Sequence, residues 1–159
     1  MPQFRIALAQ VNSTVGDLAG NAQTIIEWTS RAAARGAGLV LFPEMMLTGY
    51  PVEDLALRAS FVDASIAALG TTAARLAAEG LGGIPVVTGY LGRRAGLPPH
   101  TGQPSSAAQN AAALLHGGKV VVTTAIPPSP SAASRSATPC SAAIDASTND
   151  ARSARSSTG

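Results

Sequence analysis

The sequence predicts an α/β fold with parallel strands, and three stretches near its N-terminus carry this prediction. Phe4–Val11 places large apolar residues at alternate positions, which is typical of a strand. Residues 21–35 have the apolar spacing of a helix, and Leu39–Phe42 is a continuous apolar run that predicts a buried strand. A strand, a helical crossover and a second strand pair in parallel, so we expect a layered α/β domain.

The first predicted helix has recognisable ends and one apolar face. Asn21 follows a turn-rich stretch and is predicted to be the N-cap, and Gly36 is predicted to end the helix in the left-handed conformation. The predicted apolar face consists of Ala22, Ile25, Ile26, Thr29, Ala32 and Ala33.

The remaining elements are predicted from the same kinds of pattern. Beyond Pro51 we expect a short helix over 53–58, a longer helix over 60–78, a strand over 85–89, a surface loop over 92–106, and a hairpin with strands over 111–115 and 119–124. The apolar face expected for the longer helix consists of Phe61, Ala64, Ala68, Leu69, Thr72 and Leu76.

Composition narrows the class of protein. The 159 residues carry a net charge of +2, which gives no electrostatic case for binding nucleic acid or an anionic membrane. The single cysteine, Cys140, excludes an internal disulfide and fits a reducing compartment. No secretion signal or run of transmembrane length is visible, so we expect a cytoplasmic protein. His100 and His116 are too isolated in the sequence to indicate a metal site.

The chain changes character after residue 125. Residues 126–159 are mainly serine, alanine, proline and threonine, and their large aliphatic residues are Ile126 and Ile144. Such a segment cannot bury enough apolar surface to offset its conformational entropy. We therefore expect a partial domain over 1–125, which should fold poorly in isolation, and a low-complexity, disordered tail over 126–159.

Glu44 is the main candidate for a catalytic residue. It follows the apolar run Leu39–Phe42 after a single proline. A carboxylate beside a buried strand is costly unless it has partners or a function, and catalytic side chains of α/β proteins gather at strand ends. The plainer alternative is that Glu44 caps a nearby helix.

Several motifs resemble the carbon–nitrogen hydrolase (nitrilase) superfamily. They are residues 7–12 (ALAQVN), 15–21 (VGDLAGN), 41–44 (LFPE) and 47–55 (LTGYPVEDL), and residues 109–119 are similar to the hairpin that follows in that family. The chain looks most like the N-terminal glutaminase domain of glutamine-dependent NAD synthetase, apparently truncated.

The resemblance implies an αββα sandwich, incomplete in this chain, with a Glu–Lys–Cys triad. Glu44 matches the family's general base, and Tyr50 matches a position that lines the approach to the substrate, although packing on the loop would also explain it. In the family the cysteine attacks the amide of glutamine and the lysine stabilises the oxyanion.

The resemblance also implies cofactors and partners. The ammonia would pass to a synthetase domain that uses ATP to convert nicotinic acid adenine dinucleotide to NAD. Glutamine is therefore the expected substrate, no cofactor is expected in this chain itself, and family members are homo-oligomers.

The other two members of the triad are not found by this pattern. Lys119 lies at the hairpin turn, whereas the family lysine follows the second hairpin strand, where this chain has Ile126 and prolines. Cys140 stands between proline and serine, without the apolar strand that carries the family nucleophile. Asn110 is predicted to fix backbone geometry near the site. We therefore expect an inactive N-terminal fragment.

Two other functions stay open. The chain could be a non-catalytic interaction protein that docks on an intact synthetase. It could also be a fragment of another nitrilase-type amidase, such as an ω-amidase or a carbamoylase, although the segment Gly49–Asp54 weighs against this.

Overall fold

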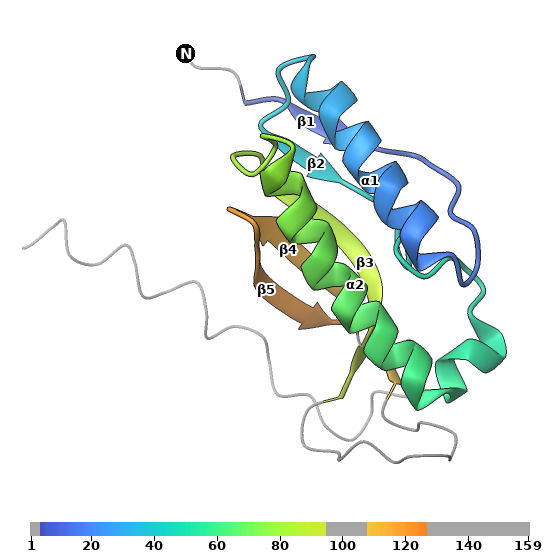
Figure 1. Cartoon of the computed structure of the whole chain (residues 1–159). Helices are drawn as coiled ribbons and strands as arrows, with labels where there is room; N and C mark the ends of the chain where they lie inside the picture. The colour runs from blue at the N-terminus through green and yellow to red at the C-terminus, as the bar shows by residue number, and fades with distance from the viewer. Residues whose placement is uncertain (1–3, 95–107, 127–159) are drawn as a thin grey trace, which may run out of the picture. The chain divides into compact units, whose positions relative to one another are not determined.

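A computed structural model describes residues 4–94 and 108–126 of the chain, and it confirms the predicted α/β fold (Figure 1). In chain order the elements are β1 (Ile6–Leu8), α1 (Leu18–Ala33), β2 (Leu39–Leu41), the 3-10 helix η1 (Glu53–Leu57), α2 (Ala59–Ala78), β3 (Val86–Arg93), β4 (Ala108–His116) and β5 (Lys119–Ala125). The predicted disordered tail lies outside the described residues apart from Ile126, so the division of the chain after residue 125 stays a prediction.

The strands form one five-stranded sheet in the order β1-β2-β3-β4-β5. The pairs β1–β2 and β2–β3 are parallel, because the connections between these strands pass through α1 and α2. The pairs β3–β4 and β4–β5 are antiparallel, and Gly117 and Gly118 form the turn of the β4–β5 hairpin. Both the parallel pairing and the hairpin were predicted.

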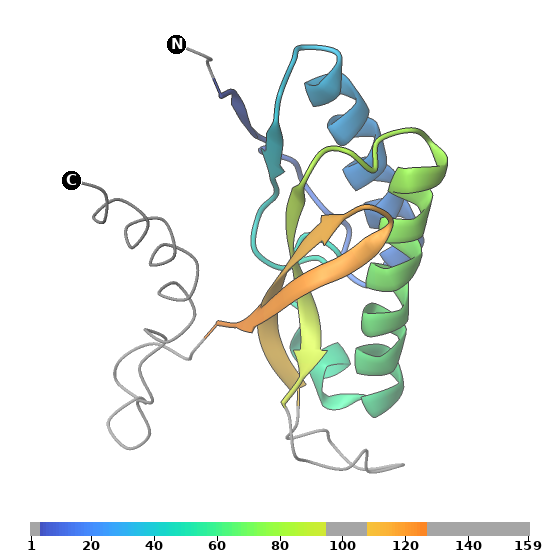
Figure 2. The same ribbon diagram turned by 90° about the vertical axis from the view of Figure 1, so that its left-hand side faces the viewer.

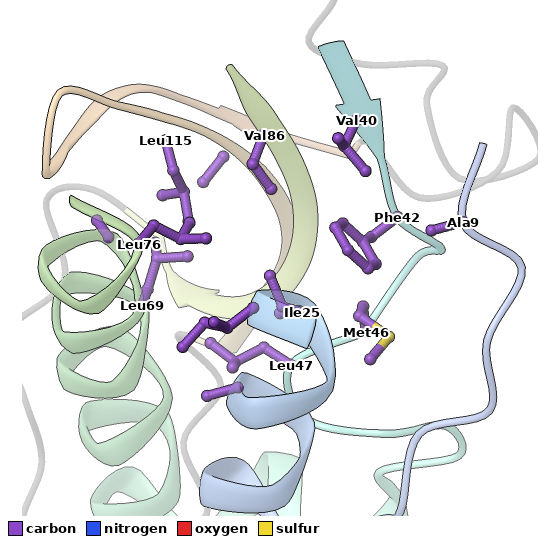
Figure 3. Close-up of a cluster of buried hydrophobic side chains, with 14 of the residues drawn as sticks. Ala9, Ile25, Val40, Phe42, Met46, Leu47, Leu69, Leu76, Val86 and Leu115 are labelled. Carbon is purple, nitrogen blue, oxygen red and sulfur yellow. The ribbon is translucent and has the colours of Figure 1, made fainter. Parts of the chain in front are cut away.

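Both helices cover the same face of the sheet (Figure 2). Between the two layers lies a cluster of buried apolar side chains, and several of them converge in Figure 3, among them Ile25 of α1, Leu76 of α2, and Val40, Val86 and Leu115 of the strands. The described residues thus make one helix layer and one sheet layer, which is half of the four-layer sandwich that the resemblance implies.

The prediction for the start of α1 is wrong. Asp17 is the N-cap, and its carboxylate accepts a hydrogen bond from the backbone N–H of Gly20 at 2.9 Å. Asn21 lies one turn inside the helix, where it is buried. The predicted apolar face is otherwise confirmed, because five of its six residues are buried: Ala22, Ile25, Ile26, Thr29 and Ala32.

The predicted face of α2 is wrong in part. Leu69, Thr72 and Leu76 are buried as expected, but Ala64 is exposed and Phe61 is only half-buried. The other buried residues are Val62, Ser65 and Ala73. Alanine occurs on every side of this helix, so the sequence offers little contrast between its faces.

The third strand is longer than predicted. It continues beyond Gly89 to Arg93, so the start of the predicted 92–106 loop belongs to β3, and residues 95–107 lie outside the described part. Within the described ranges, no helix is long and apolar enough to cross a membrane.

Candidate active site

Glu44 is presented by a tight turn that follows β2. Backbone N–H groups of Thr48 and Gly49 donate to the carbonyl oxygen of Met45 at 3.1 and 2.8 Å, which closes the turn. Met45, Met46 and Leu47 are buried beneath it, whereas the side chain of Glu44 is exposed. The turn is therefore anchored in the core by its buried side chains, and the carboxylate of Glu44 lies at the surface.

The third strand holds this turn through a glycine. A Cβ atom added to Gly89 would lie 2.3 Å from the backbone nitrogen of Met45 and 2.9 Å from the Cα of Glu44. Real atoms cannot approach this closely, so only glycine lets the turn rest on β3. The carbonyl of Gly89 also accepts a hydrogen bond from the backbone N–H of Leu47 at 3.1 Å. We did not predict this role from the sequence, although an isolated glycine inside a strand pattern is a recognised sign of close backbone approach.

Asn21 holds the turn from the other side. Its side chain donates to the carbonyl of Leu47 at 3.1 Å and to the carbonyl of Thr14 at 2.8 Å, and it accepts from the N–H of Thr14 at 2.9 Å. The N–H of Gly16 donates in turn to the carbonyl of Thr48 at 2.9 Å. Asn21 thus joins the loop before α1 to the turn that carries Glu44.

Asn110 contacts the catalytic candidate directly. Its Nδ2 donates a hydrogen bond to Oε1 of Glu44, and its backbone carbonyl accepts from the N–H of Ile126 at 2.8 Å. Sequence reasoning predicted a role in fixing the backbone and missed the contact with the carboxylate. Its Oδ1 is buried and has no hydrogen-bond partner among the described residues. Asn110 is therefore suited to orient Glu44 while leaving the second carboxylate oxygen available.

Tyr50 lies at the end of the same turn. Its side chain is 75% exposed, so it does not pack into the loop as the plainer alternative supposes. Gly49, just before it, has a φ of +77°, and a Cβ there would lie 2.5 Å from the Cα of Val15. The predicted role of Tyr50 in lining the approach to the substrate stays a prediction.

Comparison with known proteins shows to which protein family the chain belongs. The sequence profile described as "Carbon-nitrogen hydrolase" matches residues 5–125, which include Glu44, Gly89 and Asn110. The chain belongs to the carbon–nitrogen hydrolase family.

Three similar proteins place the chain within that family. The glutamine-dependent NAD(+) synthetase of Xanthomonas campestris pv. campestris is 40% identical over 123 residues, which are 76% of this chain and 19% of that protein. The structure of glutamine-dependent NAD+ synthetase from Acinetobacter baumannii is 28% identical with a TM-score of 0.63, over 82% of this chain and 22% of that one. An amidase structure from Nesterenkonia sp. is 26% identical with a TM-score of 0.58, over 79% and 44%.

These coverages show how much of its relatives the chain spans. It covers about a fifth of each synthetase and less than half of the amidase. The chain therefore spans only part of each relative, and its match to the carbon–nitrogen hydrolase profile supports homology to the glutaminase part of the synthetases.

Lys119 lies far from Glu44 in this carbon–nitrogen hydrolase domain. It pairs with His116 at the turn of the hairpin, whereas Asn110, which contacts Glu44, lies near the opposite end of β4. His116 lies six residues beyond Asn110 along β4, which corresponds to about 20 Å. The chain leaves β5 beside Asn110, at Ile126, and this is where the resemblance places the family lysine.

Cys140 and His100 lie outside the described residues. In residues 4–94 and 108–126 there is no group of three or more His, Cys, Asp and Glu side chains that could hold a metal ion.

A cavity of about 180 Å³ lies on the β3–β4–β5 part of the carbon–nitrogen hydrolase domain, and Tyr90 lines it. Burial raises the pKa of Tyr90 above its ordinary value of 10.0, and a hydrogen bond with Thr123 acts in the opposite direction. The folded chain therefore keeps the phenolic proton at a pH where the unfolded chain has lost it.

This difference predicts a loss of stability in alkali. The contribution of Tyr90 to the free energy of unfolding is fully present below about pH 10 and falls as the pH rises through the folded-state pKa. We expect Tyr90→Phe to reduce this fall in urea unfolding measured on either side of pH 10, with the exposed Tyr50→Phe as the control. Equal pH dependence in the two variants would contradict the prediction.

Proposed function

We propose that this chain provides the general base of a carbon–nitrogen hydrolase site for a carboxamide, with Glu44 as the base and glutamine as the substrate. The observation that carries the proposal is the position of Glu44, an exposed carboxylate held by the side chain of Asn110 and by a turn that Gly89 and Asn21 fix. Glutamine is proposed because the similar synthetases are glutamine-dependent.

The chemistry explains why such a base needs partners. A thiol becomes an effective nucleophile when a neighbouring base removes its proton, and the tetrahedral intermediate needs a donor or a positive charge for its oxyanion. In a single-residue mutant of the Nesterenkonia amidase, acrylamide has added to the active-site cysteine. The described residues of this chain contain no cysteine, and Lys119 lies at the far end of the hairpin.

We therefore propose that residues 1–159 do not hydrolyse glutamine by themselves. By the same resemblance, ATP would be used by a separate synthetase domain and not by residues of this chain. The nucleophile, the base and the oxyanion donor act together, and their contributions to the rate are not additive. The loss of two of them therefore removes most of the rate enhancement.

A chimera tests the proposal. Residues 5–125 of this chain would replace the matching part of the Xanthomonas synthetase, and ammonia release from glutamine would be measured by a coupled assay. We expect the chimera to release ammonia and Glu44→Gln to lower kcat by about 10²–10⁴-fold. Glu27→Gln, an exposed carboxylate on α1, is the matched control and should leave the rate unchanged.

Two results would count against the proposal. An active chimera that tolerates Glu44→Gln would remove Glu44 from the reaction. Ammonia release by the purified 159-residue chain, sensitive to Glu44→Gln, would show that the chain is active alone.

A different carboxamide substrate is the second candidate. The structural similarity to the Nesterenkonia protein favours it, because that protein is an amidase. A chimera that releases ammonia from short aliphatic amides faster than from glutamine would support this candidate.

A further inference from the structure

Met45, the residue after Glu44, has a backbone conformation that methionine rarely adopts. Its φ is +55°, in the left-handed region, where the Cβ of an L-residue crowds the following carbonyl oxygen. Among the described residues other than glycine, only Glu53 also has a positive φ. Such a conformation is unfavourable, and it persists only where the surrounding contacts hold it.

Backbone contacts hold Met45 on both sides. Its nitrogen lies against Gly89 of β3, where an added Cβ would come within 2.3 Å of it. Its carbonyl oxygen accepts from the N–H groups of Thr48 and Gly49, and the buried hydroxyl of Thr48 lies 3.3 Å from the same oxygen. The peptide groups before and after Met45 are therefore both fixed.

The side chain of Met45 is anchored apart from those of its neighbours. Met46 and Leu47 lie in the main cluster between the sheet and the helices (Figure 3). Met45 is 4% exposed and packs in a second, smaller cluster with Val62 of α2 and Leu91 of β3. Consecutive residues of the turn thus enter two separate clusters, and the catalytic candidate comes directly before the first of them.

We propose that Met45 is a positioning residue for Glu44. The anchored side chain of Met45 holds the turn in its left-handed conformation, and this conformation directs the carboxylate of Glu44 to Asn110, which donates a hydrogen bond to it. This role depends on the proposed function, in which Glu44 is the general base. A base has to lie within hydrogen-bond reach of the proton that it removes, so its direction matters to the rate.

Two truncations of Met45 separate the anchoring from the strain. Met45→Ala and Met45→Gly both remove the side chain from the second cluster, but only glycine adopts a φ of +55° without a steric cost. We therefore expect Met45→Gly to unfold at a higher urea concentration than Met45→Ala in the 159-residue chain. A midpoint for Met45→Gly at or below that of Met45→Ala would show that the turn stores no strain at this residue, against the proposal.

The chimera with the Xanthomonas synthetase tests the effect on the reaction. We expect Met45→Ala to lower kcat for glutamine about 10–100-fold with little change in KM, because a misplacement of about 1 Å can cost on the order of 100-fold in rate. Met45→Gly should be slowed at least as much, although it is the more stable truncation. Met45→Leu keeps an apolar side chain of similar volume and should recover most of the rate.

Leu76→Ala is the matched control for these variants. It also removes a large buried side chain, but Leu76 belongs to the main cluster and lies beside the β4–β5 turn, whereas Asn110 lies near the opposite end of β4. Leu76→Ala should lower the urea midpoint and leave kcat unchanged at a temperature where both chimeras are folded. Equal kcat values for Met45→Ala and Leu76→Ala would overturn the proposal.

The side-chain amide resonance of Asn110 gives a readout in the 159-residue chain that does not require activity. It should shift in Met45→Ala and stay in place in Met45→Leu and Leu76→Ala, because it reports the contact with Glu44. An unchanged resonance in Met45→Ala would also overturn the proposal. If Glu44→Gln left the rate of the chimera unchanged, the proposed function would fail, and the Asn110 resonance would still decide whether Met45 places the carboxylate.

Discussion

Replacing Gly89 with alanine should lower the free energy of unfolding by about 3 kcal/mol, which is at the upper end of the usual cost of overpacking. The added methyl group meets backbone atoms of Met45 and Glu44 at 2.3 and 2.9 Å, and no rotamer change can relieve a clash with backbone. Either β3 or the turn must move, and the hydrogen bond between Leu47 and Gly89 is then strained or lost.

A second glycine provides the matched control for this prediction. Gly70 lies inside α2, and a Cβ there would meet no atom within 4 Å. Gly70→Ala should therefore stabilise the chain by about 0.5–1 kcal/mol, because alanine has the higher helix propensity. Urea unfolding of both variants measures the two effects.

The position of Glu44 gives a further readout for Gly89→Ala. The side-chain amide resonance of Asn110 reports its contact with the carboxylate, and we expect it to shift in Gly89→Ala and to stay in place in Gly70→Ala. If Gly89→Ala proved as stable as the parent chain, with an unchanged Asn110 resonance, the turn would not depend on the glycine.

Replacing Asn21 with alanine should cost about 2 kcal/mol or more. The side chain is buried and makes three hydrogen bonds, and its removal leaves the N–H and carbonyl of Thr14 and the carbonyl of Leu47 without that partner. Buried polar groups without partners cost more than the hydrogen bond itself contributes.

Asp17→Ala is the matched comparison for Asn21→Ala. Asp17 lies at the start of the same helix and makes one exposed hydrogen bond, with the N–H of Gly20. Its loss should cost about 1 kcal/mol, which is the usual effect of removing an N-cap. The two variants differ in whether the lost bonds connect separate segments, and chemical denaturation should rank Asn21→Ala as clearly the more damaging. The opposite ranking would show that Asn21 acts as a simple helix-end residue.

The order and pairing of the strands could be predicted because the sequence patterns are local. Leu39–Phe42 is apolar without interruption, and the consecutive glycines at 117 and 118 predict a turn. The parallel pairing then follows from the length of the crossovers. The position of Glu44 at the end of β2 could be predicted for the same reason.

The remaining features depend on contacts between distant segments. Asp17 and Asn21 are both suitable N-cap residue types, and the choice between them depends on Leu47, which lies 26 residues beyond Asn21. The buried position of Ser65 depends on the N–H of Leu91, which donates to its hydroxyl. Gly89 is required because the backbone of Met45 and Glu44 passes against it. An isolated glycine in a strand pattern indicates a close approach, but the local sequence does not show which segment approaches.

The turn that carries Glu44 can fold early during synthesis of the chain. The contacts described above that hold it come from within residues 14–110, and Gly16, Asn21, Gly89 and Asn110 are among the residues that make them. A ribosome synthesises these residues before anything beyond β5, and chains generally fold as their N-terminal units emerge. The carboxylate can therefore reach its final position while the chain is still growing, and any group added later meets a base that is already in place.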